Sequence, residues 1–136
     1  MTIPKQGRYT TDCIDSLQEG KRAELIDGEI FAITVPDRIH QRLNMYLSAA
    51  IYDHIQHNSL PCEVYAAPFA VYLTDDKRNY VEPDISVICD SSKLSDRGCE
   101  GAPDWIIEIV SPSSSRTDYL IKLLKYRSAG VRLYWI

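Results

Sequence analysis

Two apolar runs that carry carboxylates constrain the fold of this chain more than any other feature. Asp84 follows a proline and begins a run that continues from Ile85 to Cys89, and Glu108 lies inside the run from Trp105 to Val110. Runs this rich in Val and Ile predict buried strands. A carboxylate in a buried strand is costly unless it is paired, hydrogen-bonded or bound to a metal. The two runs therefore predict a sheet that carries acidic groups for a chemical purpose.

A helical pattern follows the second run. Asp118, Lys122 and Tyr126 recur in it at a spacing of four, which places them on one helix face. Two carboxylates on successive strands, with a lysine on the next helix, indicate a divalent-metal site. A simpler interpretation stays open, in which Asp118 and Lys122 form only an ion pair between helix turns, worth roughly 0.3–0.5 kcal/mol.

The size and charge of the chain limit its class. Its 136 residues predict one domain, 1–136, large enough to bury a core. The net charge of -4 argues against a protein held to nucleic acid mainly by bulk charge, because phosphate contacts come from Lys and Arg. It does not exclude an enzyme whose metal neutralises a phosphate locally. No signal segment and no apolar run of roughly 20 residues is present, so we expect a cytoplasmic protein without a membrane span.

The cysteines are scattered along the chain. None of the four, Cys13, Cys62, Cys89 and Cys99, forms a Cys-x-x-Cys pair. We therefore expect neither a zinc site nor a disulfide framework. Cys89 ends an apolar strand, where we expect it to act as a small buried hydrophobic residue.

The first half of the chain predicts a helix, a hairpin and a second, long helix. The short helix spans Tyr9 to Leu17, and the Asp27-Gly28 pair between apolar runs predicts the hairpin turn. Asp37 is placed to cap the long helix, which extends roughly to Asn58. Its predicted apolar face comprises Ile39, Leu43, Tyr46, Leu47, Ala50, Ile51 and Ile55.

The second half predicts strands, one helix and a final strand. Residues 62–67 and 69–73 alternate as half-buried strands do, and the run from Tyr80 continues a meander. The Ser, Asp and Gly content of 90–103 predicts a surface loop. A right-handed crossover through the last helix would lay residues 131–136 parallel to the Glu108 strand. The expected order is αββαβββαβ, a mixed β-sheet flanked by helices, hence α/β or α+β.

Several motifs then resemble a known family. They are Glu24-Leu-Ile-Asp-Gly-Glu-Ile, His40 at the start of the long helix, Pro83-Asp84-Ile-Ser-Val, Ala102-Pro-Asp-Trp-Ile-Ile-Glu-Ile-Val-Ser-Pro-Ser, Asp118-x-x-x-Lys122-x-x-x-Tyr126 and Ala129-Gly-Val-x-x-Tyr-Trp-Ile. In this order and spacing they resemble the bacterial, mostly cyanobacterial, restriction endonuclease family of the PD-(D/E)XK nuclease superfamily. The resemblance covers about Tyr9 to Ile136 and implies a restriction-endonuclease-like fold.

The resemblance also implies a catalytic site. Asp84 and Glu108 match the two metal-binding acids, and Glu24 matches a further family glutamate. Val110 stands where the superfamily usually has its lysine, and Lys122 matches a lysine moved to the following helix. Mg²⁺ or Mn²⁺ would be the cofactor, since two carboxylates suit a hard cation that keeps several waters and bridges to phosphate. The implied activity is hydrolysis of phosphodiester bonds in DNA.

Simpler roles for the same residues remain open. Asp84 could cap a turn after its proline. Glu24 is equally compatible with a third metal-site acid and with a structural pair to Lys or Arg. We expect His40 to pack or hydrogen-bond at the helix start, and Tyr126 to lie in the core with its hydroxyl on a polar group. Lys125 is expected to be a solvated helix residue. In this second class of interpretation, the chain is a weak or inactive nuclease fold that acts as a binding or interaction module.

The end of the sequence carries the last expectation. In the resembled family Tyr134-Trp135-Ile136 continues into further strands, so the sequence is expected to lack the C-terminal extension of the family. A terminal apolar strand without its neighbour exposes unpaired backbone groups. We therefore expect a homodimer or larger assembly that covers this edge or an adjacent apolar patch.

Overall fold

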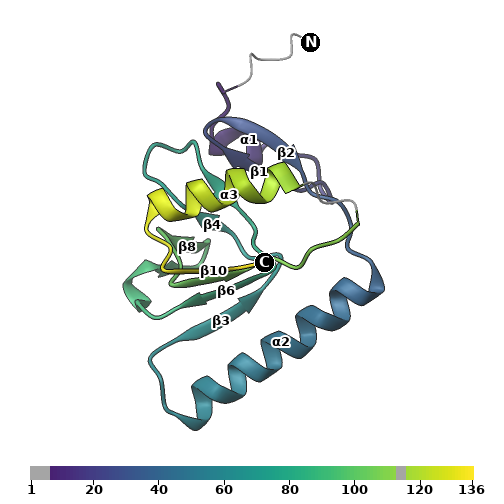
Figure 1. The fold of residues 1–136 in the computed structure, drawn as a ribbon. Coiled ribbons are helices and arrows are strands. Elements are labelled where there is room, and N and C mark those ends of the chain that lie inside the picture. The colour runs from purple at the N-terminus through teal and green to yellow at the C-terminus, as the bar shows by residue number, and fades with distance from the viewer. Residues whose placement is uncertain (1–6, 113–115) are drawn as a thin grey trace.

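Two mixed sheets and three helices build the described part of the chain (Figure 1). The computed structural model describes residues 7–112 and 116–136, with the backbone alone for 116–118. The helices are α1 (Thr11–Asp15), α2 (Arg38–His57) and α3 (Arg116–Ala129), with a 3-10 turn η1 (Ser91–Lys93). The strands are β1 (Ala23–Ile26), β2 (Glu29–Ala32), β3 (Glu63–Ala66), β4 (Val71–Tyr72), β5 (Tyr80–Val81), β6 (Ile85–Ile88), β7 (Leu94–Ser95), β8 (Gly98–Glu100), β9 (Trp105–Ile107) and β10 (Leu133–Trp135). The expected α/β class is confirmed, with two sheets in place of one.

The four-stranded sheet, ordered β10-β9-β6-β3, contains both acidic runs. Its central strand β6 is buried at every position, as the Val and Ile content predicts. β6 and β9 are antiparallel, and Ile85 lies opposite Ile107. One residue further along this register, Asp84 comes opposite Glu108. β10 returns parallel to β9 through α3, as expected from the crossover.

The six-stranded sheet, ordered β2-β1-β5-β4-β8-β7, begins with the predicted hairpin. Ile26 pairs with Glu29 around Asp27 and Gly28, which have φ of 50° and 78°. Positive φ at both central residues is the twist-matched two-residue turn that Asp-Gly favours. This sheet holds Glu24 of β1 in place beside β5.

The segment 90–103 was wrongly predicted as a surface loop. It contains η1, β7 and β8, so seven strands lie between α2 and residue 112, more than the expected order αββαβββαβ has there. Strands of two and three residues are too short to show an alternating pattern. Gly98 has φ +140°, and a Cβ there would lie 2.2 Å from the Ala70 carbonyl oxygen. The backbone of β8 therefore packs closely against Ala70, which directly precedes β4, and this position requires glycine.

One apolar core joins the two sheets. Its buried members are Ile26, Val71, Leu73, Val81, Ile88, Cys99, Ile106 and Tyr126. Tyr126 brings α3 into this core and is only 1% exposed. Ala129 and Tyr134 pack against the same cluster, which anchors α3 and the strand that follows it.

The long helix α2 lies beside β3, away from α3 (Figure 1). Asp37 caps it as predicted, since its Oδ1 accepts from the backbone N–H of His40 at 2.8 Å. The predicted apolar face is covered only in its C-terminal part: Leu47 and Ile51 are half-buried, whereas Ile39 is 62% and Tyr46 is 72% exposed. Ile55 is the buried residue of α2, because the helix meets the molecule along the edge strand β3 and not over a sheet face.

The expectation of unpaired cysteines was also wrong. Cys62 and Cys89 form a disulfide, and Cys89 is half-buried. The antiparallel register that sets Glu63 opposite Ile88 makes these cysteines the next facing pair, which scattered spacing in the sequence does not reveal. Among the described helices, none is both long enough and apolar enough to cross a membrane.

Candidate active site

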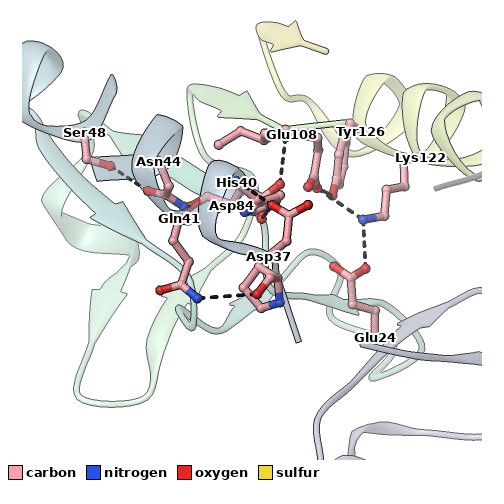
Figure 2. Close-up of polar contacts among 12 residues, drawn as sticks. Glu24, Asp37, His40, Gln41, Asn44, Ser48, Asp84, Glu108, Lys122 and Tyr126 are labelled. Atoms are coloured by element: carbon pink, nitrogen blue, oxygen red, sulfur yellow. Dashed lines mark hydrogen bonds and ion pairs between the residues drawn. The ribbon is translucent and has the colours of Figure 1, made fainter. Parts of the chain in front are cut away.

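A cavity of about 900 Å³ lies where α2, α3 and the two sheets meet. Carboxylates from three parts of the chain line it: Glu24 of β1, Glu82 and Asp84 between β5 and β6, and Glu108 directly after β9. α3 contributes Lys122, and α2 contributes a polar wall from the other side (Figure 2). The cavity therefore collects the acidic residues that the sequence analysis singled out.

Glu108 is the most buried of these carboxylates, at 6% exposed. Its backbone N–H donates to the Trp135 carbonyl at 2.9 Å and so extends the β9–β10 pairing. The side-chain Oε1 accepts from the Tyr126 hydroxyl at 3.0 Å and from Lys122 Nζ at 3.2 Å. Burial, with the nearby charges of Glu24 and Asp84, outweighs these partners and raises the pKa of Glu108 to about 8.

Lys122 bridges two acids in the site. Its Nζ lies 2.8 Å from Glu24 Oε1 and 3.2 Å from Glu108 Oε1, and its side chain is 15% exposed (Figure 2). Burial alone would lower the pKa of Lys122, but the charges of Glu108 and Glu24 outweigh burial and hold it above its ordinary value. Glu24 Oε2 also accepts from the Glu82 backbone N–H at 2.9 Å. Lys122 is thus a fixed cation between β1 and β9.

Asp84 is held through both of its carboxylate oxygens. Oδ2 accepts from the backbone N–H of Ile109 at 2.7 Å, and His40 Nε2 lies 3.2 Å from Oδ1. Its backbone carbonyl accepts from the Asn44 side chain and from the Ala67 N–H, both at 2.9 Å. These bonds fix the carboxylate at the point where the antiparallel register brings it opposite Glu108.

Glu82 and Arg22 belong to the site although the sequence analysis did not single them out. Arg22 Nε donates to Glu82 Oε1 at 3.3 Å, and both side chains line the cavity. Burial raises the pKa of Glu82. Glu82 lies two residues before Asp84, and side chains two apart in extended chain share a face. That spacing was the available signal for Glu82, whereas Arg22 carried none.

The cavity has an excess of negative charge. Apart from the exposed Asp37 at the start of α2, four carboxylates and two side chains of Lys or Arg line it among the described residues, which gives a formal net charge of -2 for Asp, Glu, Lys and Arg. Enclosed charge of one sign is unfavourable unless a proton or a cation balances it. Burial first, and then the charges of Glu24 and Asp84, raise the pKa of Glu108 in this cavity.

The donor set fits a hard divalent cation. Mg²⁺ is usually bound through one or two carboxylates, with water and substrate phosphate completing its shell. Asp84 and Glu108, facing each other across two paired strands, supply those two carboxylates. Within the described ranges, no three His, Cys, Asp or Glu side chains gather closely enough to hold a metal on their own.

Several sequence predictions meet in this cavity and others lie outside it. Tyr126 is in the core with its hydroxyl on Glu108, as expected. His40 lies at the helix start with its Nε2 3.2 Å from Asp84 Oδ1. Lys125 is not a solvated residue, because its ammonium pairs with Asp27 and its side chain is 17% exposed. The side chain of Asp118 lies outside the described residues, and with it the alternative in which Asp118 and Lys122 form an ion pair.

Known proteins share the sequence pattern and the fold. An uncharacterized protein from Synechocystis sp. is 25% identical over 101 residues, which are 74% of this chain and 52% of that protein, so the chain spans about half the length of this relative. A crystal structure from Anabaena variabilis, of "a putative nuclease belonging to DUF820", superposes with a TM-score of 0.74 at 24% identity, covering 93% of this chain and 72% of that chain.

That structural match establishes the fold. The family resemblance seen in the motifs is confirmed by the family profile itself. The profile of Uma2, described as "Putative restriction endonuclease", matches residues 10–136. The chain therefore belongs to the Uma2 family.

Proposed function

We propose that this chain is a metal-dependent endonuclease that hydrolyses phosphodiester bonds in DNA. The observation that carries the proposal is the placement of Asp84 opposite Glu108 in one acidic cavity, with Lys122 at 3.2 Å from Glu108. Family membership supports the same activity. Asp84, Glu108 and Lys122 are the proposed catalytic residues, and DNA is the proposed partner.

Asp84 and Glu108 would hold Mg²⁺ or Mn²⁺. Glu24 shares the Lys122 ammonium with Glu108 and would be a candidate third acid of the metal site. When bound, such a metal lowers the pKa of a coordinated water and polarises a phosphoryl oxygen. The protein's own contribution is electrostatic and geometric. The Ile109 N–H and the Tyr126 hydroxyl fix the two carboxylates before substrate arrives, so that little reorganisation is needed.

Lys122 would orient the attacking water or stabilise charge that develops on the phosphate. These roles require an ammonium within reach of the reacting atoms and not a fixed distance along the chain. Val110 replaces the strand lysine usual in the superfamily, and Lys122 enters the same cavity from α3. Pairing with Glu24 keeps Lys122 charged and in place.

A binding module that retains the fold is the second candidate. The specific observation in its favour is Val110 at the usual lysine position, together with the net charge of -4.

The homodimer expected at the sheet edge also stays a prediction. Leu133 and Trp135 of the edge strand β10 are 44% and 51% exposed, and a dimer at this edge should cover them. Sedimentation of the chain would show whether the dimer forms.

Cleavage of plasmid DNA separates the two candidates. We expect nicking or linearisation that requires Mg²⁺ or Mn²⁺, stops with chelator and returns when metal is added back. The Glu108→Gln protein serves as the matched control for contaminating nucleases. Metal-independent binding of DNA without cleavage by the purified wild type would favour the binding module.

A further inference from the structure

A polar stripe on α2 faces the candidate site. His40, Asn44 and Ser48 recur at a spacing of four, and all three line the cavity. Ser48 Oγ donates to Asn44 Oδ1 at 3.0 Å, and Asn44 donates to the Asp84 carbonyl at 2.9 Å (Figure 2). His40 reaches the Asp84 carboxylate itself. The stripe therefore converges on one residue of the proposed metal site.

The contact between His40 and Asp84 has a defined chemistry. His40 Nε2 lies 3.2 Å from Asp84 Oδ1, and because a carboxylate oxygen only accepts, this contact is attractive when Nε2 carries the hydrogen. The two side chains are 13% and 18% exposed, so water competes little for the contact. A carboxylate has about four acceptor positions. The hydrogen bond from the Ile109 N–H and the contact with His40 occupy two of them and leave room for a cation.

The position of His40 is itself set by its helix. The Asp37 side chain caps α2 on the His40 backbone N–H, and His40 is in the first turn of the helix. In this half of α2 the neighbouring apolar residues Ile39 and Leu43 are 62% and 45% exposed. The N-terminal half of α2 is thus joined to the site by polar contacts to Asp84 and not by packing.

We propose that His40 is a positioning residue for Asp84 and sets the affinity of the site for its divalent cation. Held at Oδ1 by His40 and at Oδ2 by the Ile109 backbone, the Asp84 carboxylate cannot rotate away from Glu108. Without the imidazole, one oxygen is free to turn into solvent. The inference deepens the proposed function, because it requires the metal site but not the cleavage of DNA.

Binding of Mn²⁺ to the intact chain without DNA, measured by isothermal titration calorimetry, tests this directly. His40→Leu should weaken Mn²⁺ binding by about 10–100-fold, the usual cost of losing a partner of a metal ligand. His40→Gln should retain most of the affinity, because its amide nitrogen takes the place of imidazole Nε2. His40→Asn places its amide near Nδ1 instead, and should bind as weakly as His40→Leu. Circular dichroism confirms that each variant is folded.

His57→Leu is the matched control, since His57 is an exposed histidine at the other end of α2. It should leave Mn²⁺ affinity unchanged. In cleavage assays His40→Leu should raise the metal concentration needed for half-maximal rate, while the rate at saturating metal stays close to wild type. A merely structural histidine would lower the saturated rate and the melting temperature together.

The outcomes separate this inference from the proposed nuclease activity. Mn²⁺ binding that depends on His40 in a chain that cleaves no DNA supports the inference and refutes the nuclease. Cleavage with metal affinity equal in His40→Leu and wild type refutes the inference alone. Absence of Mn²⁺ binding to the wild type, or equal loss in His40→Gln and His40→Leu, also overturns it. If His40→Leu does not fold, the comparison of His40→Gln with His40→Asn decides.

Discussion

Two helices approach the same cavity from different sides, and they are held in different ways. α3 packs Tyr126, 1% exposed, into the core and uses the same residue to bond Glu108. α2 has Ile55 as its buried residue and reaches Asp84 through His40 and Asn44. Glu108 is therefore fixed by a side chain that the core orders, whereas Asp84 depends on polar contacts and on backbone.

This difference separates the two contributions that a metal site needs. The α3 side supplies rigidity and the cation Lys122, since the core and the site share Tyr126. The α2 side supplies a wall whose outer surface leaves Ile39 and Tyr46 exposed. Substitutions on α3 should thus change stability and function together, whereas those on α2 should separate them.

The largest expected effect comes from substitution of the two carboxylates. Asp84, contacted by α2, and Glu108, contacted by α3, should be equally necessary for cleavage. Asp84→Asn and Glu108→Gln should each reduce plasmid cleavage by more than about 100-fold, the scale of losing one preorganised electrostatic group. Without metal, neither melting temperature should fall, because each change relieves repulsion in an acidic cavity. A clear drop in melting temperature for both variants would assign these residues structural roles instead.

Truncation of one tyrosine on each helix should show the difference in anchoring. Tyr126→Ala should lower the free energy of unfolding by about 3–5 kcal/mol, as for other buried aromatic side chains. Tyr46→Ala, at a residue 72% exposed, should change it by no more than about 0.5 kcal/mol. Urea denaturation measures both. Equal losses would mean that α2 is packed against something that covers Tyr46 in solution, such as a second copy of the chain.

Two lysines on α3 provide a matched pair. Lys122→Met leaves Glu24 and Glu108 without their shared cation and should cost about 3 kcal/mol, near the lower end for a broken buried pair because Glu108 can take up a proton. Lys125→Met should cost no more than about 1 kcal/mol, since its partner Asp27 is 64% exposed. Cleavage should be lost in Lys122→Met alone. Comparable rates of DNA cleavage by the two variants would show that Lys122 has no catalytic role.

Among the residues that line the cavity, the smallest effect is expected from the α2 residue that contacts the Asp84 backbone. Asn44→Ala removes the donor to the Asp84 carbonyl, which keeps its bond from the Ala67 N–H. It also removes the acceptor of the Ser48 hydroxyl, so the cost should be about 1–2 kcal/mol, as for two hydrogen bonds, when unfolding is followed in urea. A loss above 3 kcal/mol would show that the polar wall stabilises the fold and not only the site.

Much of the fold follows from local patterns in the sequence. The Val and Ile runs predict β6 and β9, and Asp27-Gly28 predicts the first hairpin, because each pattern has one favourable structure. The short strands β7 and β8 and the Cys62–Cys89 pair depend on long-range pairing, which no local pattern records. The prediction that the whole apolar face of α2 is buried was wrong for a related reason. Periodicity identifies an apolar face but not whether another part of the chain covers it.

The sequence predicts those residues of the candidate site whose type is unusual for their surroundings. A carboxylate inside an apolar run, such as Glu108, is conspicuous because burial is costly without a partner. Arg22 and Asn44 are ordinary surface-type residues, and only the fold brings them to the cavity. Asn44 lies 40 positions before Asp84 in the sequence, so their contact becomes visible only in the folded chain.

The central claim is that Asp84 and Glu108 together hold one divalent cation. A crystal of the chain soaked in Mn²⁺, measured near the manganese absorption edge, tests this claim most directly. We predict one anomalous difference peak in contact with both carboxylates, absent in Glu108→Gln. No peak in this cavity, or a peak bound only by residues outside it, would contradict the account.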